Sequence, residues 1–200
     1  MRMSISLSRV QAFRRFTVAF LCISSLMSAH AAFHLWSIQE IYTDSSGKLQ
    51  FIELATTEGG QNYVNGLSVT AAPGNRLTGH TITVPGNELP GDTTGHSLLF
   101  GTAGLQAAGG PAPDYIVPDN FLYQGAGNLN FFDAVFAAYS SLPLDGVHSW
   151  IAGGGTAVNS PRNYSGQTGF VIAPAPEPAA SVLLGLGLLG MRIFRRKSAS

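Results

Sequence analysis

The fold class of this chain is decided by residues 38–55, IQEIYTDSSGKLQFIELA. Residues 38–43 and 48–55 are rich in the β-branched, aromatic and aliphatic side chains that are typical of strands. Between them, Asp44-Ser45-Ser46-Gly47 has the chemistry of a turn, because aspartate hydrogen-bonds its own backbone and glycine adopts a positive φ without strain. The stretch therefore predicts a β-hairpin.

The rest of residues 32–173 continues this pattern. Of the 24 glycines in the chain, 21 lie in this region, and clusters of Gly, Pro, Asn and Asp separate short apolar stretches. Such spacing, at about ten residues, favours an all-β sandwich or barrel. Further strands are predicted at residues 64–70, 80–84, 97–101, 128–132 and 147–152. Residues 103–113 are expected to be an exposed loop, and residues 134–139 a short helix.

The charges divide the chain into three parts, although its formal net charge is zero. Eight of the 11 basic residues lie near the two ends, whereas 10 of the 11 acidic residues lie in the middle. Three basic against ten acidic residues give the middle part a formal charge of −7. An acidic domain without a basic stripe argues against binding to nucleic acid.

Residues 1–31 have the three parts of a secretory signal peptide. Arg14 and Arg15 end a basic leader, an apolar run follows, and Ala29-His30-Ala31 has the small-x-small pattern that signal peptidase requires. We therefore expect cleavage after Ala31 and export across the inner membrane. The only cysteine, Cys22, lies within this segment, so the processed protein would contain neither a disulfide nor a cysteine metal site.

The C-terminal residues 174–200 combine three features in a fixed order. Pro176-Glu177-Pro178 belongs to a stiff proline-rich segment, and residues 179–191 are apolar and uncharged. A basic cluster then follows, made of Arg192, Arg195, Arg196 and Lys197. By the positive-inside rule, this basic end stays in the cytoplasm and the domain lies outside. A plain C-terminal membrane anchor has the same apolar-then-basic order and is the alternative.

These three features resemble the PEP-CTERM sorting signal. The resemblance covers about the last 27 residues. It implies recognition of Pro176, Glu177 and Pro178 by an exosortase, a membrane transpeptidase of bacteria with an outer membrane and abundant exopolysaccharide. It also implies that the C-terminal helix holds the chain in the inner membrane before processing. Arg192 departs from the pattern, because it interrupts the apolar run before Ile193 and Phe194.

The predicted hairpin carries a second resemblance. Ile38-Gln39-Glu40-Ile41, then Phe51-Ile52-Glu53-Leu54, then Val64-Asn65-Gly66-Leu67-Ser68-Val69 are similar to the opening of lamin-tail domains. The resemblance implies a small immunoglobulin-like β-sandwich that serves as a non-enzymatic interaction module. We therefore expect a single immunoglobulin-like β-sandwich at residues 32–173, between the signal peptide and the sorting segment.

Two sets of side chains are candidates for chemistry within the domain. Asp92, His96 and Asp114 would form a metal site if the fold brought them together, although neither HExxH nor a Cys/His cluster occurs. Ser97, Asp145 and His148 would form a nucleophilic triad, although Ser97 lacks a GxSxG elbow. We expect neither set to be a site, so the sequence predicts no metal, no cofactor and no catalytic residue.

Two further features have a structural and a functional interpretation. The oxygen-rich stretches 44–47 and 92–95 suit calcium but lack the spaced acids of an EF-hand loop, so we expect turns. Five aromatic residues suggest either a ligand-stacking surface or the core, and the core is expected. They are Phe131, Phe132, Phe136, Tyr139 and Trp150.

The sequence thus predicts an exported, non-enzymatic protein of the cell surface or extracellular matrix. Its function would be structural or adhesive, with exopolysaccharide as a partner. A secreted carbohydrate- or calcium-binding module is the first alternative, and a small secreted hydrolase is the second.

Overall fold

Residues 35–173, the part of the chain that the computed structural model describes, fold into ten β-strands in two sheets and contain no helix. The larger sheet has the order β10-β9-β1-β2-β5-β6, and the smaller sheet the order β4-β3-β7-β8. All neighbours are antiparallel except β5 and β6. The strands are β1 (Ser37–Thr43), β2 (Gln50–Ala55), β3 (Ser68–Pro73), β4 (His80–Thr83), β5 (Ser97–Gly101), β6 (Tyr115–Ile116), β7 (Gly127–Phe131), β8 (Val135–Tyr139), β9 (His148–Ile151) and β10 (Gly155–Val158).

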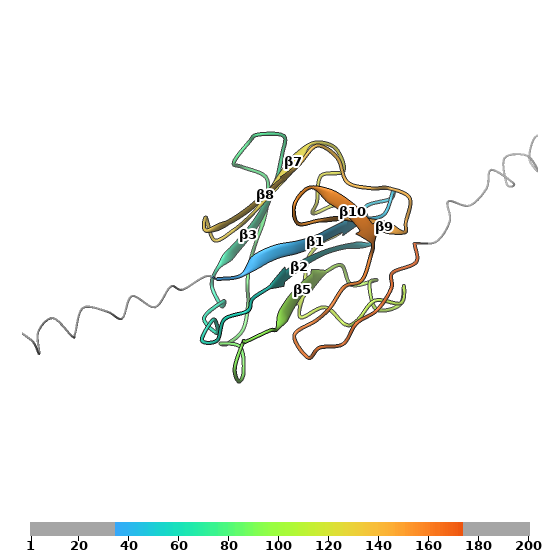
Figure 1. Cartoon of the computed structure of the whole chain (residues 1–200). Helices are drawn as coiled ribbons and strands as arrows, with labels where there is room; N and C mark the ends of the chain where they lie inside the picture. The colour runs from blue at the N-terminus through green and yellow to red at the C-terminus, as the bar shows by residue number, and fades with distance from the viewer. Residues whose placement is uncertain (1–34, 174–200) are drawn as a thin grey trace, which may run out of the picture. The chain divides into compact units, whose positions relative to one another are not determined.

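The two sheets form a β-sandwich, as the sequence predicts. Strands β3, β7 and β8 lie together on one side of β1, β2 and β5 (Figure 1). The order β1-β2-β5 matches strands A, B and E of immunoglobulin domains, and β8-β7-β3 matches strands G, F and C. The hairpin of β9 and β10 is an addition, which extends the larger sheet beyond β1.

The main hydrophobic core lies between the facing sides of the two sheets. Because successive side chains of a strand point to opposite faces, every second residue of a regular strand enters this core. Burial of these aliphatic and aromatic side chains is the main favourable contribution to folding. The larger sheet contributes Ile38, Ile41, Ile52, Leu54, Leu98, Phe100 and Trp150, and the smaller sheet contributes Val69, Ala71, Leu129, Phe131, Val135, Ala137 and Tyr139.

The hairpin of β1 and β2 confirms the prediction from residues 38–55. The Asp44 carboxylate accepts hydrogen bonds from the Leu49 backbone N–H, at 3.0 Å, and from the Ser46 hydroxyl. Gly47 has a φ of +70°, which a residue with a Cβ rarely adopts. The aspartate and the glycine thus have the roles that the turn chemistry predicts.

A β-bulge in β1 decides which side chains reach which face. Ile38 pairs with Leu54 and Glu40 pairs with Glu53, so Gln39 is an extra residue on β1. Such an extra residue shifts the alternation of side chains by one position. Ile38 and Ile41 both enter the core for this reason, although they are three residues apart, and Glu40 lies on the opposite, outer face.

A second, smaller core covers part of the outer face of the larger sheet. Tyr42, Phe51 and Leu99 of this face pack with Leu105 and Val171. The expectation of an exposed loop at residues 103–113 is therefore wrong for Leu105, which has no exposed surface. The sequence alone does not show that this sheet is buried on both faces.

The boundaries of several other elements differ from the sequence prediction. Residues 134–139 are not a helix, because Val135–Tyr139 is strand β8, paired with β7 over its whole length. Strand β3 begins at Ser68 rather than at residue 64, because Gly66, at a φ of +78°, belongs to a turn closed by a Leu67 N–H to Val64 C=O bond. Strands β6 and β10 are short additions that the sequence does not predict.

Candidate functional site

Two carboxylates lie side by side on the outer face of the larger sheet. Glu40 of β1 and Glu53 of β2 are directly opposite residues in the antiparallel ladder, and both side chains are buried. Directly opposite residues of such a pair have Cα atoms about 4.5–5.5 Å apart. The bulge at Gln39 makes this pair, because without it the Glu40 side chain would face the core.

Each of the two carboxylates accepts one hydroxyl and one backbone N–H. The Glu53 carboxylate accepts the Ser97 hydroxyl at 2.8 Å and the Arg162 N–H at 3.0 Å. The Glu40 Oε1 accepts the Ser149 hydroxyl, and also the Ser160 N–H at 3.0 Å. These hydrogen bonds satisfy buried oxygen atoms that would otherwise be costly to remove from water.

A third carboxylate, that of Asp114, completes the pattern. Its Oδ2 accepts the Leu99 N–H at 2.8 Å and the Tyr164 N–H at 2.9 Å. Three side-chain carboxylates thus bind the backbone N–H groups of residues 160, 162 and 164. Arg162 forms a β-bridge with Thr168, and the Gly166 N–H to Asn163 C=O bond closes a turn, so the three N–H groups belong to a stretch that turns back at Tyr164.

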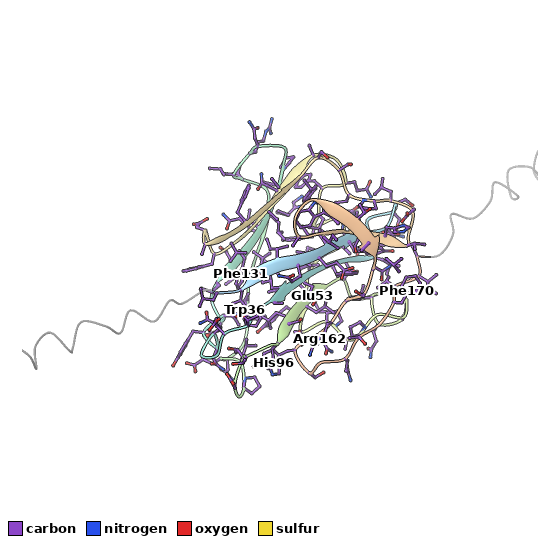
Figure 2. All side chains as sticks on the ribbon, in the orientation of Figure 1. Trp36, Glu53, His96, Phe131, Arg162 and Phe170 are labelled. Carbon is purple, nitrogen blue, oxygen red and sulfur yellow. The ribbon has the colours of Figure 1, made fainter. Side chains whose placement is uncertain are left out.

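We call residues 159–173 the C-terminal strap. The Asn159 side-chain amide binds the Val171 backbone at both its N–H and its C=O, and the Ile172 N–H donates to the Ala108 C=O. Figure 2 shows Glu53 beside Arg162 of this strap. The first half of the strap therefore donates backbone N–H groups to three carboxylates, and its second half packs into the second core through Val171.

Burial raises the pKa of all three carboxyl groups. For Glu40, Glu53 and Asp114, desolvation is the largest cause, and the hydrogen bonds from the strap act in the opposite direction. The neighbouring charge of Glu40 raises the pKa of Glu53 further, whereas the Arg162 guanidinium lowers it. Carboxyl groups of this kind occur both in acid–base catalysis and in structural networks.

A groove of about 590 Å³ runs along this pair. We call it the carboxylate groove. Glu40, Glu53, Ser97, Ser160 and Arg162 line it, together with Gln39, Ala55, Ile151, Thr168 and Gly169. Both glutamates accept hydrogen bonds from backbone N–H groups of the strap, so their oxygen atoms attach the strap to the sheet.

The structure does not bring Ser97, Asp145 and His148 together. Asp145 and His148 are hydrogen-bonded at 2.6 Å, but Ser97 donates its hydroxyl to Glu53. Strand β5, which holds Ser97, is separated by β2 and β1 from β9, which holds His148. Three strand spacings of about 4.8 Å place them about 14 Å apart or more. This set therefore makes no triad.

Asp92, His96 and Asp114 make no metal site either. Asp114 binds backbone N–H groups, the His96 ring binds the Tyr164 C=O at 2.8 Å, and Asp92 binds Thr94. Within residues 35–173, no group of three His, Cys, Asp or Glu side chains is placed to hold a metal ion. The stretches 44–47 and 92–95 are turns closed by their own aspartates, with Gly95 at a φ of +72°.

The five aromatic candidates divide into two groups. Phe131, Tyr139 and Trp150 are core residues, as expected. The expectation is wrong for Phe132 and Phe136, which are 41% and 60% exposed. Phe136 alternates with core residues along β8, and Phe132 lies at the tip of the β7–β8 hairpin.

The sequence does not single out Glu40 and Glu53, although both lie in the predicted hairpin. The sequence feature that could have identified them is a charged residue within an apolar strand, as in Phe51-Ile52-Glu53-Leu54. Such a residue is usually exposed at the solvent face of a sheet. Only the strap, more than 100 residues away in sequence, explains why these two are buried.

The remaining candidate residues lie outside the described part of the chain. They are the signal peptidase site Ala29 and Ala31, the motif Pro176, Glu177 and Pro178, and the basic cluster Arg192, Arg195, Arg196 and Lys197. Within residues 35–173, the structure holds no helix that is long and apolar enough to cross a membrane. The strap ends at Ala173, directly before the proline-rich segment.

Comparison with known proteins identifies this segment. A family model described as the PEP-CTERM protein-sorting motif matches residues 174–197, which confirms the resemblance seen in the sequence. No curated protein and no solved structure matches the chain, so the resemblance to lamin-tail domains is not confirmed. The chain therefore carries a C-terminal PEP-CTERM protein-sorting motif, which implies export, transient anchoring in the membrane and processing by an exosortase.

Proposed function

We propose that the exported β-sandwich is a structural or adhesive module of the cell surface or the exopolysaccharide matrix, and not an enzyme. The observation that carries this proposal is the use of three carboxylates, of which Glu40 and Glu53 are buried and Asp114 is half-buried. Glu40, Glu53 and Asp114 hold the strap that leads to the sorting motif, so the side chains best suited to acid–base chemistry bind backbone instead.

The strap also gives the proposal a mechanical basis. The sorting motif begins at residue 174, and the Val171 and Ile172 N–H groups, directly before it, bind Asn159 and Ala108. An exosortase that acts at Pro176-Glu177-Pro178 would therefore cut close to a firmly attached segment. The trimmed domain would retain every hydrogen bond of its strap and stay folded after release.

The two alternatives differ from this proposal in what the domain must contain. A carbohydrate- or calcium-binding module requires a defined ligand site, and a hydrolase requires a convergent catalytic cluster. In residues 35–173, the turn aspartates bind their own loops, and two strands lie between Ser97 and His148. Glu40 and Glu53 in the carboxylate groove are the neighbouring carboxyl groups that a hydrolase could use.

The proposal is tested by expressing the full precursor in a host that has an exosortase. Intact masses are measured in the membrane, matrix and medium fractions, with a variant that replaces Pro176, Glu177 and Pro178 by alanine as the control. We expect the wild-type chain in the matrix fraction, without the peptide that contains Arg195, Arg196 and Lys197. The control should keep this peptide and remain in the membrane.

Other outcomes would contradict the proposal. Wild-type protein found only in the medium would exclude a structural role in the matrix. Tight, saturable binding of one purified polysaccharide, or of Ca²⁺, would favour the binding module. Glycan or peptide hydrolysis that is lost in Glu53→Gln, while the variant stays folded, would favour the hydrolase.

A further inference from the structure

Exposed apolar side chains gather at the end of the domain where the strap leads to the sorting motif. Among residues 35–173, eleven large hydrophobic side chains are exposed, and five of them lie on the strap or on segments that contact it. We call these five the end patch. They are Leu144, Val147, Val158, Phe170 and Ile172, with exposed fractions of 38–63%.

Hydrogen bonds join the strap to the segments that carry Val147 and Val158. The Asn159 side-chain amide donates to the Val147 C=O at 2.8 Å and to the Val171 C=O at 3.0 Å. Val158, the last residue of β10, directly precedes Asn159. Val147 and Val158 therefore lie beside the second half of the strap, although more than ten residues separate them from Val171 in the sequence.

The described chain ends at the same place. Gly146 lies so close to Ala173 that a Cβ on the glycine would be 2.9 Å from the alanine Cβ. Phe170 and Ile172 are exposed, whereas Val171 between them is fully buried in the second core. Figure 2 shows Phe170 beside the last described residues of the strap. The end patch thus lies around the point from which the chain continues to residue 174.

The segments around the end patch are nearly uncharged, in a domain whose formal charge is −7. None of its ten acidic residues lies in residues 101–113 or 146–173, and Arg162 is the only lysine or arginine there. The nearest acid along the chain, Asp145, is bound by two backbone N–H groups and by the His148 ring. An apolar surface without charges loses no ion hydration when it leaves water.

The sorting motif keeps this end of the domain close to the membrane before processing. The motif implies transient anchoring, and the apolar run of the chain begins at residue 179. Residues 174–178 are therefore the whole connection between Ala173 and the membrane segment. A chain extends by at most about 3.6 Å per residue, so these five residues span at most about 18 Å. The end patch of the anchored precursor stays within that reach of the membrane surface.

We propose that the end patch docks on the lipid surface of the membrane while the precursor is anchored. Contiguous exposed apolar surface on a soluble domain marks a site that binds a protein or a membrane. The short connection favours the membrane, because it holds lipid within reach of the patch in every anchored copy. The apolar side chains enter the boundary between headgroups and acyl chains, as do the apolar faces of interfacial helices.

Docking gives the sorting motif a defined position. Pro176, Glu177 and Pro178 lie between the docked patch and the membrane segment, so the chain is held at the membrane on both sides of the motif. The motif is thus presented at the membrane in which the exosortase lies. This inference rests on the anchoring that the motif implies, and it goes beyond the proposed structural function, which concerns the released domain.

The docking is tested with the anchored chain in lipid vesicles. A Cys22→Ser chain, which has no other thiol, is exported by a host without an exosortase, purified with its tail and reconstituted in phosphatidylcholine vesicles. A polarity-sensitive fluorophore is attached to Val147→Cys, and quenching by lipid that is brominated in its acyl chains reports contact with hydrocarbon. The matched control is Leu77→Cys, an exposed position in the β3–β4 loop, well away from the end of the strap (Figure 1).

We expect a blue shift and quenching for the label at Val147→Cys, and neither for the label at Leu77→Cys. Position 147 lies more than 30 residues before the apolar run, so its contact with lipid depends on the folded end patch and not on the neighbouring anchor. Quenching that is absent at position 147, or equal at both positions, would overturn the proposal.

A second measurement places a charge in the end patch. Ile172 is 63% exposed, so Ile172→Glu is compatible with the fold. This substitution should abolish the blue shift and the quenching at Val147→Cys. It should also slow the trimming of the tail in a host that has an exosortase, measured by intact mass over time. Leu77→Glu, which adds the same charge elsewhere, should change neither result.

A protein partner would give a different result. If the label at position 147 is not quenched in vesicles, but Val147→Cys crosslinks in cells to the exosortase or to a second copy, the choice of lipid is overturned. The vesicles contain neither an exosortase nor a matrix. Failure of docking is therefore distinct from failure of the proposed function, which is decided by the cell fraction in which the released protein is found.

Discussion

Glu40 and Glu53 lie opposite each other on β1 and β2, and both accept a backbone N–H from the same C-terminal strap. Neighbouring carboxylates repel each other when both are ionised, and burial makes ionisation costly. The strap compensates part of this cost, because the Ser160 and Arg162 N–H groups are donors that need acceptors. The pair and the strap therefore depend on each other for their burial.

We expect Glu53→Ala to lower the free energy of unfolding by about 1–3 kcal/mol, because a buried donor without an acceptor costs about that amount. The variant leaves the Arg162 N–H and the Ser97 hydroxyl without their acceptor. Glu53→Gln should cost less, since its amide oxygen can accept from Arg162 while its NH₂ donates to Ser97. Urea unfolding at neutral pH measures both.

The control for this prediction is Glu88→Ala, which removes an exposed acid. It should change the free energy of unfolding by less than about 0.5 kcal/mol. Equal effects of Glu53→Ala and Glu88→Ala would contradict the structural role of the carboxylate groove.

Stability should also depend on pH above the ordinary glutamate pKa of 4.5. Burial raises the pKa of Glu40 and Glu53, so between 4.5 and the raised values the folded state binds more protons than the unfolded state. Their contribution to stability is therefore fully present below pH 4.5 and is lost as the pH rises through the raised values. The double variant Glu40→Gln, Glu53→Gln should flatten this decline in urea titrations at different pH.

The pKa of Asp145 is shifted in the opposite direction, so this residue provides an internal control. The N–H groups of His148 and Val147, with the His148 ring, lower its pKa from 3.8 to about 2. Its contribution is present above pH 3.8 and is lost as the pH falls towards about 2. The double variant Glu40→Gln, Glu53→Gln should lose stability below pH 3.8 in the same way as the wild type. A wild-type stability that does not fall above pH 4.5 would contradict the raised pKa values.

The loop at residues 103–113 should be a stabilising cover. We expect Leu105→Ala to lower the free energy of unfolding by about 2–5 kcal/mol, the usual cost of truncating a fully buried leucine. Leu105 packs against Phe51 and Leu99 in the second core. Thermal or urea unfolding measures the loss, with Gln106→Ala as an exposed neighbour for comparison. Similar small effects of both substitutions would show that the loop adds little to the core.

Phe132 occupies an unfavourable backbone conformation at the hairpin tip. Both Phe132 and Asp133 have a φ of +53°, and the left-handed region costs an ordinary L-residue roughly 1–2 kcal/mol. Asparagine tolerates this region, so Phe132→Asn should raise the free energy of unfolding by about 1 kcal/mol. Phe136→Asn, which replaces an exposed phenylalanine in the neighbouring strand β8, should give no gain. A loss of stability in Phe132→Asn would show that contacts of the ring outweigh the backbone cost.

The sequence by itself determines the all-β class, the first hairpin and the sorting motif. Each is encoded locally: Asp44 and Gly47 form the turn that their chemistry predicts, and Pro176-Glu177-Pro178 belongs to a motif that is recognised as a linear segment. Local chemistry of this kind acts between residues that are close in the chain, so it can be read without the fold.

Only the tertiary structure decides the rest. The burial of Glu40 and Glu53 depends on a one-residue bulge and on donors more than 100 residues away. Residues 135–139 form a strand because β7 pairs with them, which overrides a weak local preference for helix. The exposure of Phe136 follows from its position on the outer face of that strand. Sheet pairing and burial are long-range properties, and for this reason the carboxylate groove becomes visible only when the strands are assembled.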